Sequence, residues 1–145
     1  PNTSSAASDV YKRQVFITHD LDEAVRVGHR IAIMRDGEVV QIGTPEQIVV
    51  NPSDEYVADF VKGISRLKVV KAKTIMQSIE EYKKTFGDNL SNNERVNEND
   101  ILSKLIETSV SEDKPIIVTN NDNLEVGIIT QSDLLKAVVE GNDSE

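Results

Sequence analysis

Val15-Phe-Ile-Thr-His-Asp-Leu-Asp-Glu-Ala24 is the stretch that decides the fold class of this chain. Its first four residues form a short apolar run of β-branched and aromatic side chains, which is typical of a buried strand. Asp20 stands where it can cap a following helix, and two acidic residues fall in the favourable first turn. The stretch therefore predicts an α/β unit in which His19 lies at the carboxyl edge of a sheet, where α/β proteins place their ligands.

The residues that follow predict a hairpin and then a helix. Residues 30–35 and 38–42 are apolar strand candidates joined by an Asp-Gly pair at 36–37, a strong signal for a two-residue hairpin turn. Thr44 then supplies a helix cap, a proline takes the first helical position, and Gln47 completes a capping box.

Two more helical faces complete this half. Asn-Pro at residues 51–52 ends the preceding helix, and Ser53 is expected to cap the next one. That next helix is predicted to carry Tyr56, Val57, Phe60 and Val61. In the helix after Asp20, Leu21, Ala24 and Val25 are predicted to fall on one face.

This order, with the wording HDLDEAVRVGHRIAIMRDGEVVQIGTPEQI at residues 19–48, resembles the end of the ATP-binding subunit of ABC transporters. It points to the members that import quaternary amines such as glycine betaine and proline, and it covers residues 15–64. The resemblance implies that His19 is the histidine that contacts the γ-phosphate of ATP. A fixed donor there stabilises the negative charge that builds up during hydrolysis. His29 takes a position where the family commonly has aspartate, and we interpret it as a surface substitution without a chemical role.

The start of the chain departs from that resemblance. Residues 1–14 contain no Gly-x-x-x-x-Gly-Lys-Ser/Thr phosphate loop, signature loop or strand ending in catalytic acids. We therefore expect a carboxyl-terminal fragment of a P-loop ABC ATPase domain, inactive alone, whose Mg²⁺-ATP would be held by residues outside this chain. Residues 1–14 are interpreted as a non-native or disordered tail.

Composition sets further limits. The net charge of −9 argues against general nucleic-acid binding, and the absence of cysteine excludes disulfides and thiolate metal sites. The sequence offers no metal site and no apolar run of about 20 residues that could span a bilayer. Residues 65–84 carry six basic and two acidic side chains, whereas both flanking segments are acidic. This basic segment is either a solvated face or a salt-sensitive contact with acidic segments or anionic lipid.

The second half begins with a predicted helix over residues 73–86, followed by a polar loop over 87–99. The apolar residues expected on the core side of that helix are Ile75, Met76, Ile79, Tyr82 and Phe86. Asn99 can cap a helix that carries Ile101, Leu102, Leu105 and Ile106.

Residues 115–119 and 124–130 predict two strands joined by a turn. Ser132 is expected to cap a final helix that carries Leu134, Leu135, Val138 and Val139.

This α-β-β-α order, with KPIIVTNNDNLEVGIITQSDLLKAVVEG at residues 114–141, resembles the regulatory motif of cystathionine-β-synthase type (CBS). Such motifs end the ATP-binding subunit in many quaternary-amine importers. They normally occur in pairs, so a second motif must come from another subunit or the module is degenerate. The resemblance implies an adenine-nucleotide half-site in which Thr130 faces phosphate and Asp133 accepts from ribose. The alternative is that Ser132 or Asp133 only caps a helix.

These observations predict an α/β chain with five parts: a tail (1–14), the end of an ABC nucleotide-binding domain (15–64), a basic connector (65–72), a small CBS-like regulatory domain (73–140) and an acidic tail (141–145). The implied function is that of the switch end and regulatory tail of an ATPase subunit for compatible-solute import. The implied partners are a second ATPase subunit, membrane permease subunits, indirectly a substrate-binding protein, and anionic lipid. The implied location is the cytoplasmic face of the membrane. The alternative is a stand-alone CBS-type module that senses an adenine nucleotide or ionic strength.

Overall fold

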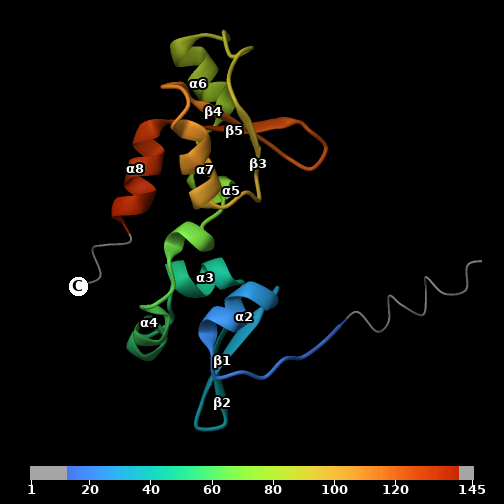
Figure 1. Cartoon of the computed structure of the whole chain (residues 1–145), viewed down its shortest axis with the longest axis vertical. Helices are drawn as coiled ribbons and strands as arrows, with labels where there is room; N and C mark the ends of the chain where they lie inside the picture. Colours follow the sequence, from blue (N-terminus) through green and yellow to red (C-terminus); the bar gives the residue numbers. More distant parts are fainter. Residues whose placement is uncertain (1–12, 141–145) are drawn as a thin grey trace, which may run out of the picture.

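Two separate sheets organise the computed structural model, which describes residues 13–140 and is mixed α/β (Figure 1). The predicted tails at 1–14 and 141–145 therefore lie outside the described residues, apart from Arg13 and Gln14. We call the part from α2 to α4 the first lobe. Its elements are α2 (Leu21–Val27), β1 (Ile31–Arg35), β2 (Glu38–Gly43), α3 (Pro45–Val50) and α4 (Glu55–Val61).

The second lobe runs from η1 to α8. Its elements are η1 (Arg66–Lys68), α5 (Ala72–Ile75), α6 (Ile79–Phe86), β3 (Arg95–Asn97), α7 (Leu102–Ser109), β4 (Ile116–Thr119), β5 (Glu125–Ile129) and α8 (Gln131–Val139). Across residues 13–140, none of the helices is both long enough and apolar enough to cross a membrane.

The predicted hairpin and capping box are confirmed. Strands β1 and β2 pair antiparallel, and both turn residues have positive φ, 52° at Asp36 and 79° at Gly37, as this type of tight turn requires. The backbone N–H of Gln47 donates to the Thr44 hydroxyl over 3.2 Å, and the Thr44 N–H donates to the Gln47 side chain over 2.9 Å. These local hydrogen bonds fix the start of α3 against the end of the hairpin.

The core of the first lobe lies between the hairpin, α3 and α4. The residues predicted to share one face of α2, namely Leu21, Ala24 and Val25, pack against this core and are partly buried. The buried members are Ile31, Ile33, Ile48, Val57 and Val61.

The predicted strand at residues 15–18 is wrong. Val15 and Ile17 are 95% and 91% exposed, and residues 15–18 form no strand within the part of the chain that the structure describes. A strand is stabilised by hydrogen bonds to a neighbouring strand, and none of the described strands pairs with this segment. It leaves the first lobe as an extended trace (Figure 1).

The predicted cap of α4 is also wrong. Asp54, rather than Ser53, accepts from the backbone N–H of Val57 over 2.9 Å. The Ser53 N–H instead donates to the side chain of Gln41 over 2.8 Å. On the predicted face of α4, Phe60 remains 44% exposed, so the buried contact comes chiefly from the two valines.

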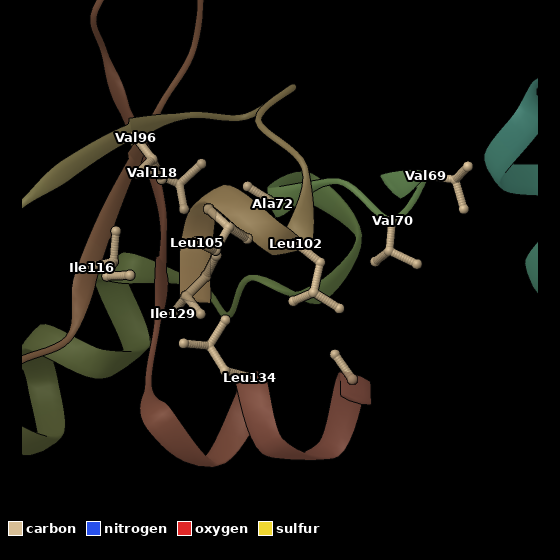
Figure 2. Packing of buried hydrophobic residues seen from close by; sticks show 11 residues of the cluster. Val69, Val70, Ala72, Val96, Leu102, Leu105, Ile116, Val118, Ile129 and Leu134 are labelled. Carbon is tan, nitrogen blue, oxygen red and sulfur yellow. The ribbon is translucent and has the colours of Figure 1, made fainter. Parts of the chain in front are cut away.

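In the second lobe the strand order is β3-β4-β5, with β3 parallel and β5 antiparallel to β4. Strands β4 and β5 confirm the two strands predicted from residues 115–119 and 124–130. Successive side chains of β4 alternate between two apolar clusters, so both faces of this strand are covered. The larger cluster joins α5, α7 and α8 to the sheet (Figure 2). Its buried members are Val69, Val70, Ala72, Val96, Leu102, Leu105, Ile116, Val118, Ile129, Leu134 and Ala137.

The helix predicted over residues 73–86 is broken in two. Between α5 and α6, Gln77 exchanges backbone hydrogen bonds with Ile128 of β5, at 2.8 and 3.1 Å. Pairing with the sheet therefore replaces helical hydrogen bonds at this point. Phe86, predicted to lie in the core, is 71% exposed and stacks beside Tyr82 with ring centroids 4.7 Å apart.

The loop predicted over residues 87–99 contains strand β3. Its central Val96 is buried, whereas Arg95 is exposed, so the segment has too little apolar pattern to read as a strand. Asn99 does not cap α7, because that helix begins after Ile101 without a side-chain cap. Asp100 orders this entry instead by accepting from the Asn97 backbone N–H over 2.9 Å.

Asp100 also accepts from the ammonium group of Lys104 over 2.8 Å. Burial acts to raise the pKa of Asp100, but the hydrogen bonds from Lys104 and from the Asn97 backbone outweigh it and hold that pKa below its ordinary value. Because the folded-state pKa is lowered, the stabilisation is present above the ordinary carboxyl pKa and is lost as pH falls through the lowered one.

Candidate functional site

His19 lies in a turn whose backbone is fixed by its two neighbours. The Asp20 N–H donates to the Thr18 hydroxyl over 3.0 Å, and that hydroxyl donates to the carboxylate of Glu23 over 2.7 Å. Asp20 caps α2 by accepting from the backbone N–H of Asp22 over 2.9 Å, which confirms its predicted role as a cap.

These contacts leave the imidazole of His19 exposed. Within residues 13–140 it takes part in neither a hydrogen bond nor an ion pair, so both ring nitrogens are available to a ligand. The sequence around His19 thus uses one hydroxyl and two carboxylates to hold the backbone, and keeps the imidazole unengaged.

Thr130 and Asp133 lie together at the start of α8. The Asp133 carboxylate accepts from the backbone N–H and the hydroxyl of Thr130, at 2.9 and 2.8 Å. The Thr130 hydroxyl in turn accepts from the Asp133 N–H over 3.3 Å. The predicted cap at Ser132 is therefore wrong, because Thr130 caps this helix through a capping box with Asp133.

Gln77 is a member of this cluster that the sequence interpretation missed. Its side-chain amide lies 2.8 and 2.7 Å from the two oxygens of Asp133. A carboxylate has about four acceptor positions, and the contacts of Gln77 with both oxygens together with the N–H and hydroxyl of Thr130 already account for all four. No local pattern marks Gln77, because it reaches Asp133 only through the bridge between its own backbone and β5.

Gly127 allows that approach. A Cβ atom at this position would collide with the side chain of Met76, the residue before Gln77. The glycine therefore matters for the close crossing of the Met76–Gln77 segment over β5.

The basic segment contributes to the second lobe rather than standing apart from it. Val69 and Val70 are buried in the larger cluster, and Figure 2 shows Val69 at the edge nearest a teal segment of the first lobe. Lys68 and Lys73 are exposed. The Nε atom of Arg66 is buried without a hydrogen-bond partner among the described residues.

The lobes are joined through α3. One carboxylate oxygen of Glu46 accepts from the backbone N–H of Lys71 over 3.2 Å and from the hydroxyl of Thr74. Val49 packs against both apolar clusters, and Val50 packs against the larger one. His19 lies just before α2 of the first lobe, whereas Thr130, Asp133 and Gln77 are in the second lobe, so they form two separate candidate sites.

No family model matches the chain. It is 39% identical over 127 residues to the trimethylamine N-oxide transport system ATP-binding protein TmoW of Pelagibacter ubique, covering 88% of this chain and 35% of that protein. It is 56% identical over 72 residues to the glycine betaine transport ATP-binding protein OpuAA of Bacillus subtilis, covering 50% and 17%. It is 57% identical over 61 residues to the glycine betaine/proline betaine transport system ATP-binding protein ProV of Escherichia coli, covering 42% and 15%.

These homologues are ATP-binding subunits of glycine betaine and trimethylamine N-oxide transport systems. The chain spans about a third of the first of them and less than a fifth of the other two.

Proposed function

We propose that this chain is the carboxyl-terminal portion of the ATPase subunit of an ABC importer for compatible solutes of the glycine betaine and proline type. The observation that carries the proposal is the His19 turn. It combines an exposed imidazole, a backbone fixed by Thr18, and a helix capped by Asp20, in a segment whose relatives are ATP-binding transport subunits. Residues 15–64 are the end of the nucleotide-binding domain in this proposal.

In the whole subunit, His19 would donate a hydrogen bond to the γ-phosphate of ATP. Donors placed where charge develops in the transition state lower the barrier without needing to reorganise. Mg²⁺ and the other phosphates would be held by the phosphate loop and acidic residues of the whole subunit, which this sequence does not contain.

The exposed segment at residues 15–17 fits the same proposal. Three successive exposed apolar residues, which pair with no strand among residues 13–140, are suited to joining the edge of a sheet. In the whole subunit this segment would be the strand that leads to His19.

The second lobe would be the regulatory tail of CBS type. Its half-site would use the Thr130 hydroxyl toward a phosphate and the Asp133 carboxylate toward a ribose hydroxyl. Gln77 would have to release one oxygen of Asp133 for a ribose to bind. A second motif from another copy of the subunit would complete the nucleotide site.

The proposed partners are a second ATPase subunit, the membrane permease subunits and, through them, a substrate-binding protein. ATPase subunits of this kind act on the cytoplasmic face of the membrane. The match to TmoW extends over 88% of the chain, which supports placing both lobes in one such subunit.

A stand-alone CBS-type sensor of an adenine nucleotide or of ionic strength is the second candidate. This candidate is favoured by the apolar cluster of the second lobe, which is larger than the cluster of the first lobe. A free sensor, however, has no use for the His19 segment.

A chimera tests the proposal. Residues 15–140 would replace the aligned segment of the trimethylamine N-oxide transport ATP-binding protein, and ATP-driven uptake would be measured in cells that lack the native subunit. The proposal expects uptake to be retained. A chimera that is folded and assembled but transports nothing, while the unaltered relative is active, would favour the sensor.

The basic segment gives a regulatory prediction within this function. Replacing Arg66, Lys68, Lys71 and Lys73 by glutamine should make transport by the chimera less dependent on salt. These cations would be attracted to acidic segments or anionic lipid, and that attraction weakens as the screening length falls to about 8 Å at physiological ionic strength. Uptake measured against salt concentration is the readout. An unchanged salt threshold would leave the segment as a solvated face.

A further inference from the structure

A cavity of about 240 Å³ lies between the two lobes. Its first-lobe wall is formed near the end of α2 and the start of α3, and its second-lobe wall by η1 and the residues after it. Apolar side chains from both lobes line part of it, including Val25 and Val69. A water molecule occupies about 30 Å³ in the liquid, so the cavity has room for a small solute with some of its hydration.

The charged groups that line this cavity do not balance. Lys68 and Lys71 are among the residues that line it, and Glu46 is the one acidic residue among them. Neither lysine has an acidic partner within ion-pair distance in residues 13–140. Glu46 is already engaged, because it accepts from the Lys71 backbone N–H and from the Thr74 hydroxyl.

His29 is a lining residue of the first-lobe wall, opposite the two lysines. Its imidazole can donate a hydrogen bond in either protonation state and adds a positive charge when protonated. Two lysines and a histidine among the lining residues, with one carboxylate that is already engaged, favour an anion in a chain whose net charge is −9.

We propose that this cavity binds a small phosphate-type anion, either inorganic phosphate or the phosphate group of a small monoester, through Lys68, Lys71 and His29. The ammonium groups would neutralise its charge, and the imidazole would donate to one oxygen. This site is separate from the Thr130–Asp133 cluster and does not depend on the proposed function.

Glu46 supplies a discriminating test. Its carboxylate would repel the bound anion across the cavity. In Glu46→Gln the amide oxygen can still accept from Lys71 and Thr74, but the repulsion is gone. Phosphate should therefore bind about three- to tenfold more tightly to this variant.

The experiment is a calorimetric titration of the full chain with sodium phosphate, and separately with glycerol phosphate, at constant ionic strength set with sodium chloride. Saturable binding to the wild type is expected. The double variant Lys68→Ala/Lys71→Ala should weaken binding by about tenfold or more, because two charge-assisted contacts are lost. The matched control Lys84→Ala/Lys136→Ala removes the same charge from outside the cavity and should change binding less than about twofold.

Lys68→Arg/Lys71→Arg should retain binding, which guards against misfolding of the alanine variant. The proposal is overturned if phosphate produces no more heat of binding than chloride does. It is also overturned if the control variant loses as much affinity for phosphate as the double variant Lys68→Ala/Lys71→Ala, or if Glu46→Gln binds phosphate no more tightly than the wild type. Binding to phosphatidylglycerol vesicles without binding of free phosphate would also overturn it, and would assign the lysines to a lipid contact.

Discussion

His19→Ala in the chimeric subunit should lower the maximal rate of ATP hydrolysis by about 10²- to 10³-fold, the usual effect of removing one transition-state donor. ATP affinity should change by no more than about threefold, because a donor that acts in the transition state contributes little to ground-state binding. The measurement is phosphate release at saturating ATP, together with the dissociation constant of a non-hydrolysable analogue.

Two controls sharpen this result. Arg26→Ala changes an exposed residue on the neighbouring helix α2 and should leave turnover within about twofold, since no role in binding or catalysis is assigned to it. The chain alone should release no phosphate above background. If His19→Ala lost affinity and turnover to the same extent, His19 would be a ground-state contact and the switch role would be wrong.

Leu105→Ala should cost about 2–5 kcal/mol of unfolding free energy, the range measured for buried leucines in well-packed cores. Leu105 lies on α7 and is fully buried, with 0% exposure, in the larger apolar cluster (Figure 2). The remaining cavity cannot collapse easily, because the sheet is covered by apolar residues on both faces. Urea denaturation followed by far-ultraviolet circular dichroism would measure the change.

Leu135→Ala is the matched control. Leu135 is one residue after buried Leu134 on α8 but is 65% exposed, so its truncation should cost less than about 0.5 kcal/mol. A loss at Leu135 comparable to that at Leu105 would mean that Leu135 is covered in solution, for instance by another copy of the chain. Val138 and Val139 of the same helix are also exposed.

The sequence predicted best those features that depend on neighbouring residues. The Asp36-Gly37 turn and the Thr44–Gln47 capping box are closed by hydrogen bonds within four residues, so their chemistry is visible in a short window. The apolar strands β4 and β5 were equally visible, because their residues are buried on both faces.

The features that failed depend on distant partners. Residues 15–18 have the composition of a strand, but none of the described strands pairs with them. Strand β3 shows the opposite case, because it pairs with β4 although its sequence is not typical of a strand. The helix predicted over 73–86 breaks because Gln77 pairs with Ile128, which lies 51 positions away.

The candidate sites divide in the same way. His19 and Asp20 could be assigned roles from their own segment, and Asp20 is a cap as predicted. The sequence places Thr130, Ser132 and Asp133 at the start of one helix. Any of the three residue types can cap a helix, so only the geometry shows that Thr130 is the cap. Gln77 and the cavity beside Lys68 and Lys71 arise only from tertiary packing, which no local pattern encodes.

The shared position of α3 has a consequence for how the chain melts. Ile48 belongs to the apolar cluster of the first lobe, Val50 packs against that of the second, and Val49 touches both. Opening either lobe therefore exposes one side of the same six-residue helix, which is too short to persist alone in water. The two lobes should consequently share a single cooperative transition, so that a disturbance at either end is felt at the other as a change in the protection of α3 amides from hydrogen exchange.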